Sequence, residues 1–254
     1  MPRDLVPTAN KNYSSTFARM ARHATTGEAN RFGTIVATLS GTEIAPFNRV
    51  FVFERPSPDT FERAVEWMSE RDVPFQITVT EDVIEDGVDF APDVDLSEPE
   101  ETQPGMVLAS LDEIPRMEPT TTVEPVTTPE EREEFLQVFS DVFDIPTEIG
   151  RDLMTDASWK DDQLMSFLGR VDDTAVACGQ LVMEGEVAGV YSIGVTEEFR
   201  RRGIGEAMTW EVLRAGRESG CQVGVLQSSE MGYELYEKMG FETVVTYHQF
   251  EPVI

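Results

Sequence analysis

The stretch from Val187 to Gln227 constrains the fold of this chain more than any other. Its first part, Ala188 to Val195, is apolar and predicts a strand. Three arginines and two glycines follow at 200–205, in the order Arg-Arg-Arg-Gly-Ile-Gly, and apolar residues then recur at helical spacing. A second short apolar run, Cys221 to Gln227, predicts another strand. This order predicts a β–α–β unit with a glycine turn at the start of its helix.

The turn at 200–205 has the properties of an anion-binding site. The first amides of a helix have no partner within the helix, and glycines let a phosphate approach the backbone closely. Arginine side chains add charge-assisted hydrogen bonds to phosphate oxygens. The same six residues also fit an ordinary surface turn with a basic patch, so taken alone they do not decide between the two interpretations.

A second motif lies at 235–241, where the chain reads Leu-Tyr-Glu-Lys-Met-Gly-Phe. Together with the turn at 200–205, it resembles the GNAT superfamily of N-acetyltransferases. The turn matches the family's Gln/Arg-x-x-Gly-x-Gly/Ala pyrophosphate loop, and the later motif matches its Leu-Tyr-x-Lys-x-Gly-Phe segment. The order and spacing of both motifs agree with the family, and the resemblance covers roughly Thr121 to Phe250.

The resemblance implies an α/β fold with a mixed sheet, and acetyl transfer from acetyl-CoA to an amine. The strand Val190–Val195 would separate from the strand Val223–Gln227, and the pantetheine arm of the cofactor would enter the gap. Tyr236 is the implied acid for the departing thiolate, and the Val195 amide is a candidate to polarise the thioester carbonyl. The residues implied in cofactor binding are Ile193, Gly194, Val195, Arg200, Arg201, Arg202, Gly203, Ile204, Gly205 and Ser229.

Two positions depart from the family pattern. Ser229 stands where the family often has an asparagine that contacts pantetheine, and Tyr191 stands where many members carry a catalytic glutamate. The general base is therefore unassigned: Glu184, Glu186 and Tyr191 are candidates, and so is a chain of water molecules. Tyr236 itself has an alternative role as a tyrosine packed at a helix end. A non-catalytic acetyl-CoA sensor or a scaffold thus stays open beside the acetyltransferase.

The N-terminal half repeats the same order of elements. Strands are predicted at 49–53 and 74–79, and Ser57-Pro58-Asp59 opens a helix between them with a cap and a first-turn proline. The turn before this helix, residues 54–59, reads Glu-Arg-Pro-Ser-Pro-Asp. Its two prolines have no amide hydrogen to offer a phosphate. We interpret residues 1–115 as a degenerate GNAT-like domain that binds no cofactor, and residues 120–254 as the acetyl-CoA-binding catalytic domain. Chance similarity between two α/β units is the alternative.

Other segments have weaker patterns. Residues 1–12 predict a loose tail and 14–30 a modest helix, while the acidic, proline-bearing stretch 81–102 predicts a loop before a strand at 106–109. Thr128-Pro129-Glu130-Glu131 is a capping box that opens a helix. A second helix is predicted near 147–154, and a hairpin turns at Asp172-Asp173. In the family the loop between two such helices helps to form the acceptor site, so the candidate pocket residues, each of which could equally be core, are Phe143, Ile149, Met154 and Trp159.

Composition restricts the partners. The 254 residues include 48 acidic and 20 basic ones, for a net charge of −28. The acidic residues are spread throughout, which favours adaptation to a salt-rich cytoplasm, as in a haloarchaeon, over binding of a cationic partner. Nucleic-acid binding is disfavoured because the phosphate backbone requires a basic face. The expected partner is a small-molecule or protein amine, and the expected state is a monomer or a homodimer.

The remaining sequence features predict a protein of the cytoplasm. Cys178 and Cys221 lie in apolar, strand-like runs, which is typical of buried thiols rather than of a disulfide or a metal site. No apolar run follows the first residues as in a signal peptide, and no stretch is long enough for a membrane helix. No cluster of histidine and cysteine suggests a metal, and the two histidines lie near no nucleophile motif.

Overall fold

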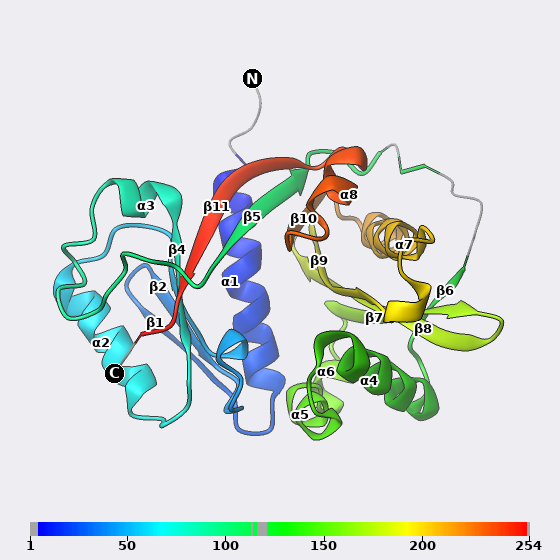
Figure 1. Ribbon diagram of the computed structural model, residues 1–254, viewed down its shortest axis with the longest axis horizontal. Coiled ribbons are helices and arrows are strands. Elements are labelled where there is room, and N and C mark those ends of the chain that lie inside the picture. The colour runs from blue at the N-terminus through cyan, green and yellow to red at the C-terminus, as the bar shows by residue number, and fades with distance from the viewer. Residues whose placement is uncertain (1–4, 113, 116–120, 253–254) are drawn as a thin grey trace. The chain divides into compact units, whose positions relative to one another are not determined.

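The computed structural model describes residues 5–112, 114–115 and 121–252 (Figure 1). Contacts divide the chain into two units that do not follow chain order. Unit 1 comprises Met1–Met106, Gln227–Tyr233 and Thr243–Ile254, and unit 2 comprises Val107–Leu226 and Glu234–Glu242. Each unit therefore contains a segment from the other half of the chain. Most of the predicted boundary between 115 and 120 lies outside the described residues, and the division into 1–115 and 120–254 stays a prediction.

The sheet of unit 1 is mixed. Its strands β1 and β2, β2 and β3, and β4 and β11 pair antiparallel, whereas β3 and β4 pair parallel. The strand that follows β11 in the sheet is β5. In sheet order the strands are β1 (Glu28–Phe32), β2 (Ile35–Leu39), β3 (Arg49–Val52), β4 (Gln76–Thr80), β11 (Glu242–Phe250) and β5 (Glu101–Leu108).

Helices cover both faces of the unit 1 sheet. α1 (Val6–His23) and α2 (Pro58–Ser69) lie on opposite sides of the strands (Figure 1). Because side chains alternate along a strand, β3 sends Val50 and Val52 to the apolar core with Phe61 of α2, and Phe51 to the aromatic residues of α1. The short helices of this unit are η1 (Ala45–Phe47) and α3 (Glu81–Glu85).

The sheet of unit 2 is also mixed. Four of its five strands form antiparallel neighbours, and β9 and β10 are the parallel pair. In sheet order the strands are β10 (Val223–Gln227), β9 (Val187–Val195), β8 (Thr174–Glu184), β7 (Leu164–Val171) and β6 (Thr122–Pro125). β10 also borders the chain after β5, because the amide of Leu111 donates to the carbonyl of Gln222 at 2.9 Å.

Two long helices cover the unit 2 sheet, with α4 (Pro129–Phe143) on one face and α7 (Ile204–Glu218) on the other (Figure 1). Phe135 and Phe139 of α4 and Met208 and Val212 of α7 are buried. The shorter helices are α5 (Thr147–Leu153), α6 (Asp156–Trp159), η2 (Glu197–Phe199) and α8 (Tyr233–Lys238). In the described part of the chain, no helix is long and apolar enough to cross a membrane.

Several local predictions are confirmed. The predicted capping box forms, with the Thr128 side chain accepting from the Glu131 amide and the Glu131 carboxylate accepting from the Thr128 amide. The β7–β8 hairpin turns at Asp172 and Asp173, both with positive φ, as a two-residue turn of the I′ type requires. Cys178 and Cys221 are free and buried.

Four local predictions are wrong. The tail predicted at 1–12 contains the start of α1, which begins at Val6 because a proline fits the first turn of a helix, and this helix ends at His23 rather than at 30. The loop predicted at 81–102 contains α3, and the strand expected at 106–109 begins at Glu101. The first four residues of the predicted tail lie outside the described residues.

Candidate active site

The parallel strands β9 and β10 separate partway along their length. Their register pairs Val223 with Val187, Gly224 with Ala188 and Val225 with Gly189, and within the described residues it goes no further. β9 nevertheless continues to Val195. Beyond Gly189 the edge of β9 that faces β10 therefore has backbone groups that β10 does not pair.

A β-bulge lies in this separated part of β9. Cys178 of β8 pairs with Gly194 and Gln180 pairs with Tyr191, so that Ser192 and Ile193 together oppose the single residue Gly179. Ser192 has a φ of 53°, in the left-handed region. The bulge is thus a strained feature of the strand rather than a continuation of the regular ladder.

The bulge determines which amides face the gap. The Thr196 amide donates to the Val176 carbonyl of β8 at 2.9 Å. Since successive amides of a strand point to opposite sides, the Val195 amide points away from β8, toward the separated edge. The Arg200 Nε donates to the Val195 carbonyl at 3.0 Å, so the carbonyl is occupied and the amide is the group of Val195 available to a ligand.

The turn at 200–205 has the backbone of an anion site. Arg201 has a φ of 59° and Gly203, which caps α7 without a side-chain hydrogen bond, a φ of 78°. The first hydrogen bond of α7 joins the Ala207 amide to the Gly203 carbonyl at 3.0 Å. The amides of Ile204 and Gly205 precede this bond, at the positive end of the helix dipole. The turn therefore offers donors to an anion.

The three arginines of this turn do not share one role. Arg200 is bound to the Val195 carbonyl, and an Arg202 Nη donates to the Glu198 carbonyl at 2.8 Å while its guanidinium lies 4.9 Å from the centre of the Phe199 ring. These two side chains brace their own loop. Arg201 is exposed to solvent. Arg201 is therefore the arginine whose side chain is most readily available to a phosphate.

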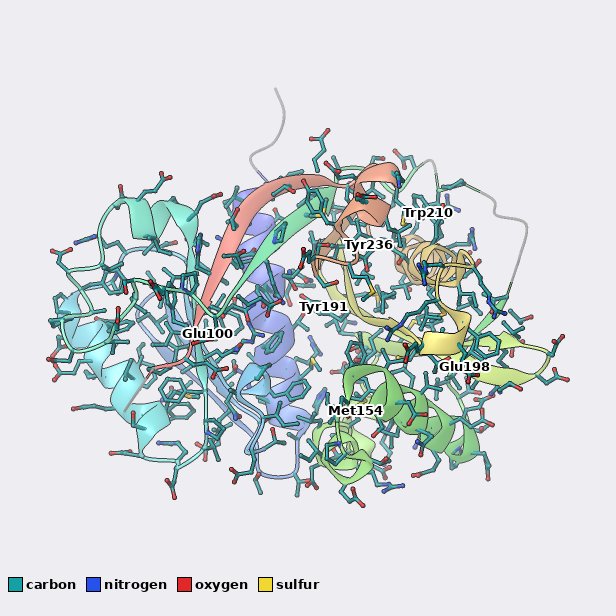
Figure 2. The ribbon with its side chains drawn as sticks, viewed as in Figure 1. Glu100, Met154, Tyr191, Glu198, Trp210 and Tyr236 are labelled. Carbon is teal, nitrogen blue, oxygen red and sulfur yellow. The ribbon has the colours of Figure 1, made fainter. Side chains whose placement is uncertain are left out.

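Tyr236 lies on α8 (Figure 2) and is linked through Thr209 to the first turn of α7. Its ring is half-buried and meets the Phe241 ring edge-on, with the centroids 5.9 Å apart. Its hydroxyl shares a hydrogen bond with the side chain of Thr209, whose own hydroxyl donates to the Gly205 carbonyl at 2.9 Å. Burial raises the pKa of Tyr236 to about 12, against an opposing effect of the bond to Thr209, so the phenol keeps its proton at neutral pH.

The remaining candidates are less closely gathered. Glu184 and Glu186 lie at the turn that precedes β9, at the opposite end of the strand from Val195, and the Glu186 carboxylate accepts from the Gln222 side chain at 2.6 Å. Tyr191 lies on β9 immediately before the bulge (Figure 2). Ser229 belongs to unit 1, where its hydroxyl accepts from the Gly232 amide at 3.3 Å.

The residues predicted to line the acceptor site also differ in their surroundings. A Cβ at Gly194 of β9 would lie 3.3 Å from the ring of Phe143, which is exposed. Met154 is buried with its sulfur 3.9 Å from the Gln180 amide nitrogen. Trp159 is half-buried, meets the Phe135 ring edge-on and donates to the Met154 carbonyl at 2.9 Å. Ile149 is half-buried on α5.

Sequence reasoning missed two polar side chains of this site, Gln180 and Thr209. Gln180 is 1% exposed and lies among apolar residues of β8, and Thr209 is fully buried in α7. A glutamine within a strand that is otherwise apolar was the one available signal, because burial of an amide requires hydrogen-bond partners. Those partners lie on other strands and could not be named from the sequence.

Residues 129–241 match the model of the Acetyltransferase (GNAT) family. No curated protein matches the sequence. The solved structures that resemble the chain over most of its length include a GCN5-related N-acetyltransferase from Kribbella flavida, with 17% identity, 96% of this chain and 95% of that chain covered, and a TM-score of 0.68. A putative acetyltransferase from the GNAT family of Novosphingobium aromaticivorans has 13% identity, coverage of 98% and 99%, and a TM-score of 0.62.

A third GNAT structure, a GCN5-related N-acetyltransferase from Sphaerobacter thermophilus, has 16% identity, 85% of this chain and 76% of that chain covered, and a TM-score of 0.61. At these identities the likeness concerns the fold. The family match covers the C-terminal region, whereas the structural likeness covers most of the chain. The predicted mixed α/β fold of GNAT type is therefore confirmed.

Proposed function

We propose that the protein is an N-acetyltransferase that transfers the acetyl group of acetyl-CoA to the amine of a small molecule or a protein. The observation that carries the proposal is the separation of β9 from β10 in front of the glycine turn at 200–205. The family match of residues 129–241 supports acyl transfer in general. The acetyl-CoA donor and the amine acceptor are what the resemblance to the GNAT acetyltransferases implies, and the separated strand and the glycine turn support the donor.

The residues of the site suit the parts of acetyl-CoA. The amides of Ile204 and Gly205, with the guanidinium of Arg201, would hold the pyrophosphate. The Val195 amide, on the separated edge of β9, would pair with the pantetheine arm. Acetyl-CoA supplies the acetyl group as a thioester.

The reaction requires a neutral amine, a polarised carbonyl and a proton for the departing thiolate. The nitrogen lone pair forms the new C–N bond while the C–S bond breaks, the amine loses one proton and the thiolate gains one. The Val195 amide would hold the pantetheine arm so that the thioester lies beside the amine, and the Tyr236 phenol would protonate the sulfur. Glu184 and Glu186 lie at the wrong end of β9 for proton removal, so we assign that step to water.

We propose a single site per chain, because the matching region of unit 1 lacks both features. The parallel strands β3 and β4 stay paired from Arg49 to Val52, the whole length of β3. The Ser57 side chain already accepts from the Thr60 amide at the start of α2, and a proline occupies the first turn. A phosphate would find no separated strand there and fewer donors at the start of the helix, since Pro58 has no amide hydrogen and the Thr60 amide is already bonded, which supports a degenerate role for the N-terminal half.

One observation favours an alternative function, a sensor that binds acetyl-CoA without turnover. Tyr191 occupies the position at which many relatives of the fold carry a glutamate, and a phenol is a weak base at neutral pH. Such a sensor would keep the binding residues of β9 and α7. The two functions differ in whether thiol is released.

A binding and turnover screen tests both functions. The full chain is titrated with acetyl-CoA at multimolar KCl and then incubated with a panel of amines, with free thiol measured over time. We expect one binding site per chain and amine-dependent thiol release. Binding with no release from any amine supports the sensor, and absence of binding contradicts both functions. Gly203→Pro is the control variant, in which binding should be lost.

A further inference from the structure

Three side chains from neighbouring strands form a buried polar chain beneath the β9 bulge. The Ser192 hydroxyl donates to Gln180 Oε1 at 3.0 Å, and Gln180 Nε2 donates to the Ser166 hydroxyl at 3.1 Å. Gln180 and Ser166 are 1% and 4% exposed, whereas Ser192 is half-buried. Gln180 therefore uses both ends of its amide to join the bulge to β8 and β7.

The conformation of Ser192 requires support. A residue with a Cβ is disfavoured at a φ of 53° because the Cβ approaches the following carbonyl, and a serine has no glycine-like freedom there. Strained residues of this kind persist where their surroundings hold them. The hydrogen bond to Gln180 and the contact of the Cys178 thiol with the Ser192 carbonyl at 3.4 Å are the contacts that hold it.

The opposite face of the bulge is shaped by Gly179. A Cβ at Gly179 would lie 2.7 Å from Ile193 Cδ1 and 3.1 Å from the Met208 methyl group. Ile193 thus fills the space that a side chain at Gly179 would need. Cys178, Gly179 and Gln180 of β8 together support the two bulge residues of β9, Ser192 and Ile193.

A change in these three residues of β8 would alter the register of β9 and so the groups on its separated edge. Adding or removing one residue in a strand reverses the side to which each later group points. Without the bulge, the Val195 amide would face β8 rather than the separated edge. The exposure of that amide therefore depends on Ser192 keeping its conformation.

We propose that Gln180 is a positioning residue that holds the β9 bulge through Ser192 and so presents the Val195 amide to the pantetheine arm of the acyl donor. This inference rests on the proposed function. Gln180 itself touches no reacting atom. It acts by making the left-handed conformation of Ser192 the stable one.

The test compares three variants with the full-length protein. Gln180→Met keeps the length of the side chain and removes its hydrogen bonds. Ser192→Gly removes the hydroxyl but accepts a positive φ without strain. The double variant combines both changes. Gln249→Met is the control for exchanging a buried glutamine for methionine without the loss of a hydrogen bond, because the Gln249 side chain is buried in unit 1 and both of its polar atoms are without a hydrogen-bond partner among the described residues.

Two ligands separate the pantetheine contact from the phosphate contact. CoA reaches both the Val195 amide and the turn at 200–205, whereas 3′-phospho-ADP has no pantetheine arm and reaches only the turn. In Gln180→Met we expect CoA affinity to fall about three- to tenfold, as for one lost hydrogen bond, with 3′-phospho-ADP affinity unchanged. If the wild type turns over an amine, the kcat of Gln180→Met should also be roughly tenfold or more below the wild-type value, because the thioester is less well positioned.

Rescue identifies the mechanism. The double variant should regain the CoA affinity that Gln180→Met loses, to within about twofold of the wild type, because glycine needs no support at this φ. Ser192→Gly alone should also bind CoA within about twofold of the wild type. The inference would be overturned if the double variant lost as much CoA affinity as Gln180→Met does, or if Gln180→Met lost none. If Gln180→Met does not fold, Ser192→Ala against Ser192→Gly gives the same contrast at one position. Failure of the wild type to bind CoA would instead contradict the proposed function.

Discussion

The phenol of Tyr236 packs against the Phe241 ring and is bound to Thr209, which is in turn bound to the first turn of α7. Burial raises its pKa to about 12, so it is an acid and not a base throughout the pH range of an assay. A group with these properties can donate a proton to a leaving thiolate. The same contacts would serve a purely structural tyrosine, and kinetics distinguishes the two roles.

We expect Tyr236→Phe to lower kcat by at least roughly tenfold, since general acid catalysis is typically worth about 10²–10⁴ in rate. CoA affinity should stay within a few-fold, because the turn at 200–205 is unchanged. The measurement is steady-state kinetics together with titration calorimetry. Unchanged turnover would show that Tyr236 only packs and that another donor serves the sulfur.

The raised pKa of Tyr236 also predicts an effect on stability. Its folded-state pKa, about 12, lies above the usual value near 10, so its contribution to stability is full below pH 10 and is lost as the pH rises toward 12. The melting temperature of Tyr236→Phe should accordingly fall less between pH 9 and pH 11 than that of the wild type. Parallel melting curves at the two pH values test this.

At the level of elements, the turn before α7 depends on a glycine with positive φ. Gly203→Ala should cost about 1–2 kcal/mol in the free energy of unfolding and should weaken CoA binding, because the strained backbone re-aims the amides of the turn. Gly185→Ala is the matched control: it has a φ of 59° in the β8–β9 hairpin, with open space around it. It should lose similar stability and keep full CoA affinity.

Elements that depend on local pattern were predictable from the sequence. β9, α7, β10 and the Thr128 capping box follow from apolar periodicity and from residues within one turn of one another. β1, α3 and α6 have five residues or fewer and too few apolar positions to set a period. Short elements of this kind form because the rest of the unit packs against them.

The site was predictable only where its residues follow one another in a single segment of the chain. The turn at 200–205 could be expected from a contiguous motif, and the separation of β9 only from the family resemblance that such motifs carry. The bulge could not, because it depends on Ser192 meeting Gln180, which is distant in sequence and lies on another strand. The loop roles of Arg200 and Arg202 were equally hidden, since their partners are backbone carbonyls and not side chains.

For the whole molecule, the net charge of −28 predicts a strong dependence on salt. Self-repulsion between acidic residues should destabilise the fold in dilute buffer, and at 1 M salt the Debye length falls to about 3 Å. We expect the melting temperature to rise by roughly 10 °C or more between dilute buffer and multimolar KCl. A flat profile in a calorimetric series would contradict the interpretation of the acidity as salt adaptation.

The exchange of segments between the two units predicts that the halves of the chain do not fold independently. A fragment of residues 120–254 would keep β11 without β4, its antiparallel neighbour, and would lose the chain around Leu111 that borders β10. We expect this fragment to be much less stable than the full chain and to lose acceptor activity more than CoA affinity. Equal stability in denaturant titrations would show that the halves are independent.

The place of β11 in unit 1 also has a consequence for the order of events on the ribosome. β4 ends at Thr80 and β11 begins at Glu242. At 5–20 residues per second, the roughly 160 residues between them take about 8–30 s to synthesise. Throughout that interval one edge of β4 carries open amide and carbonyl groups, which are a template for pairing with another nascent chain. We therefore expect slow translation to lower the yield of this protein, and shielding of that edge by a chaperone to restore it.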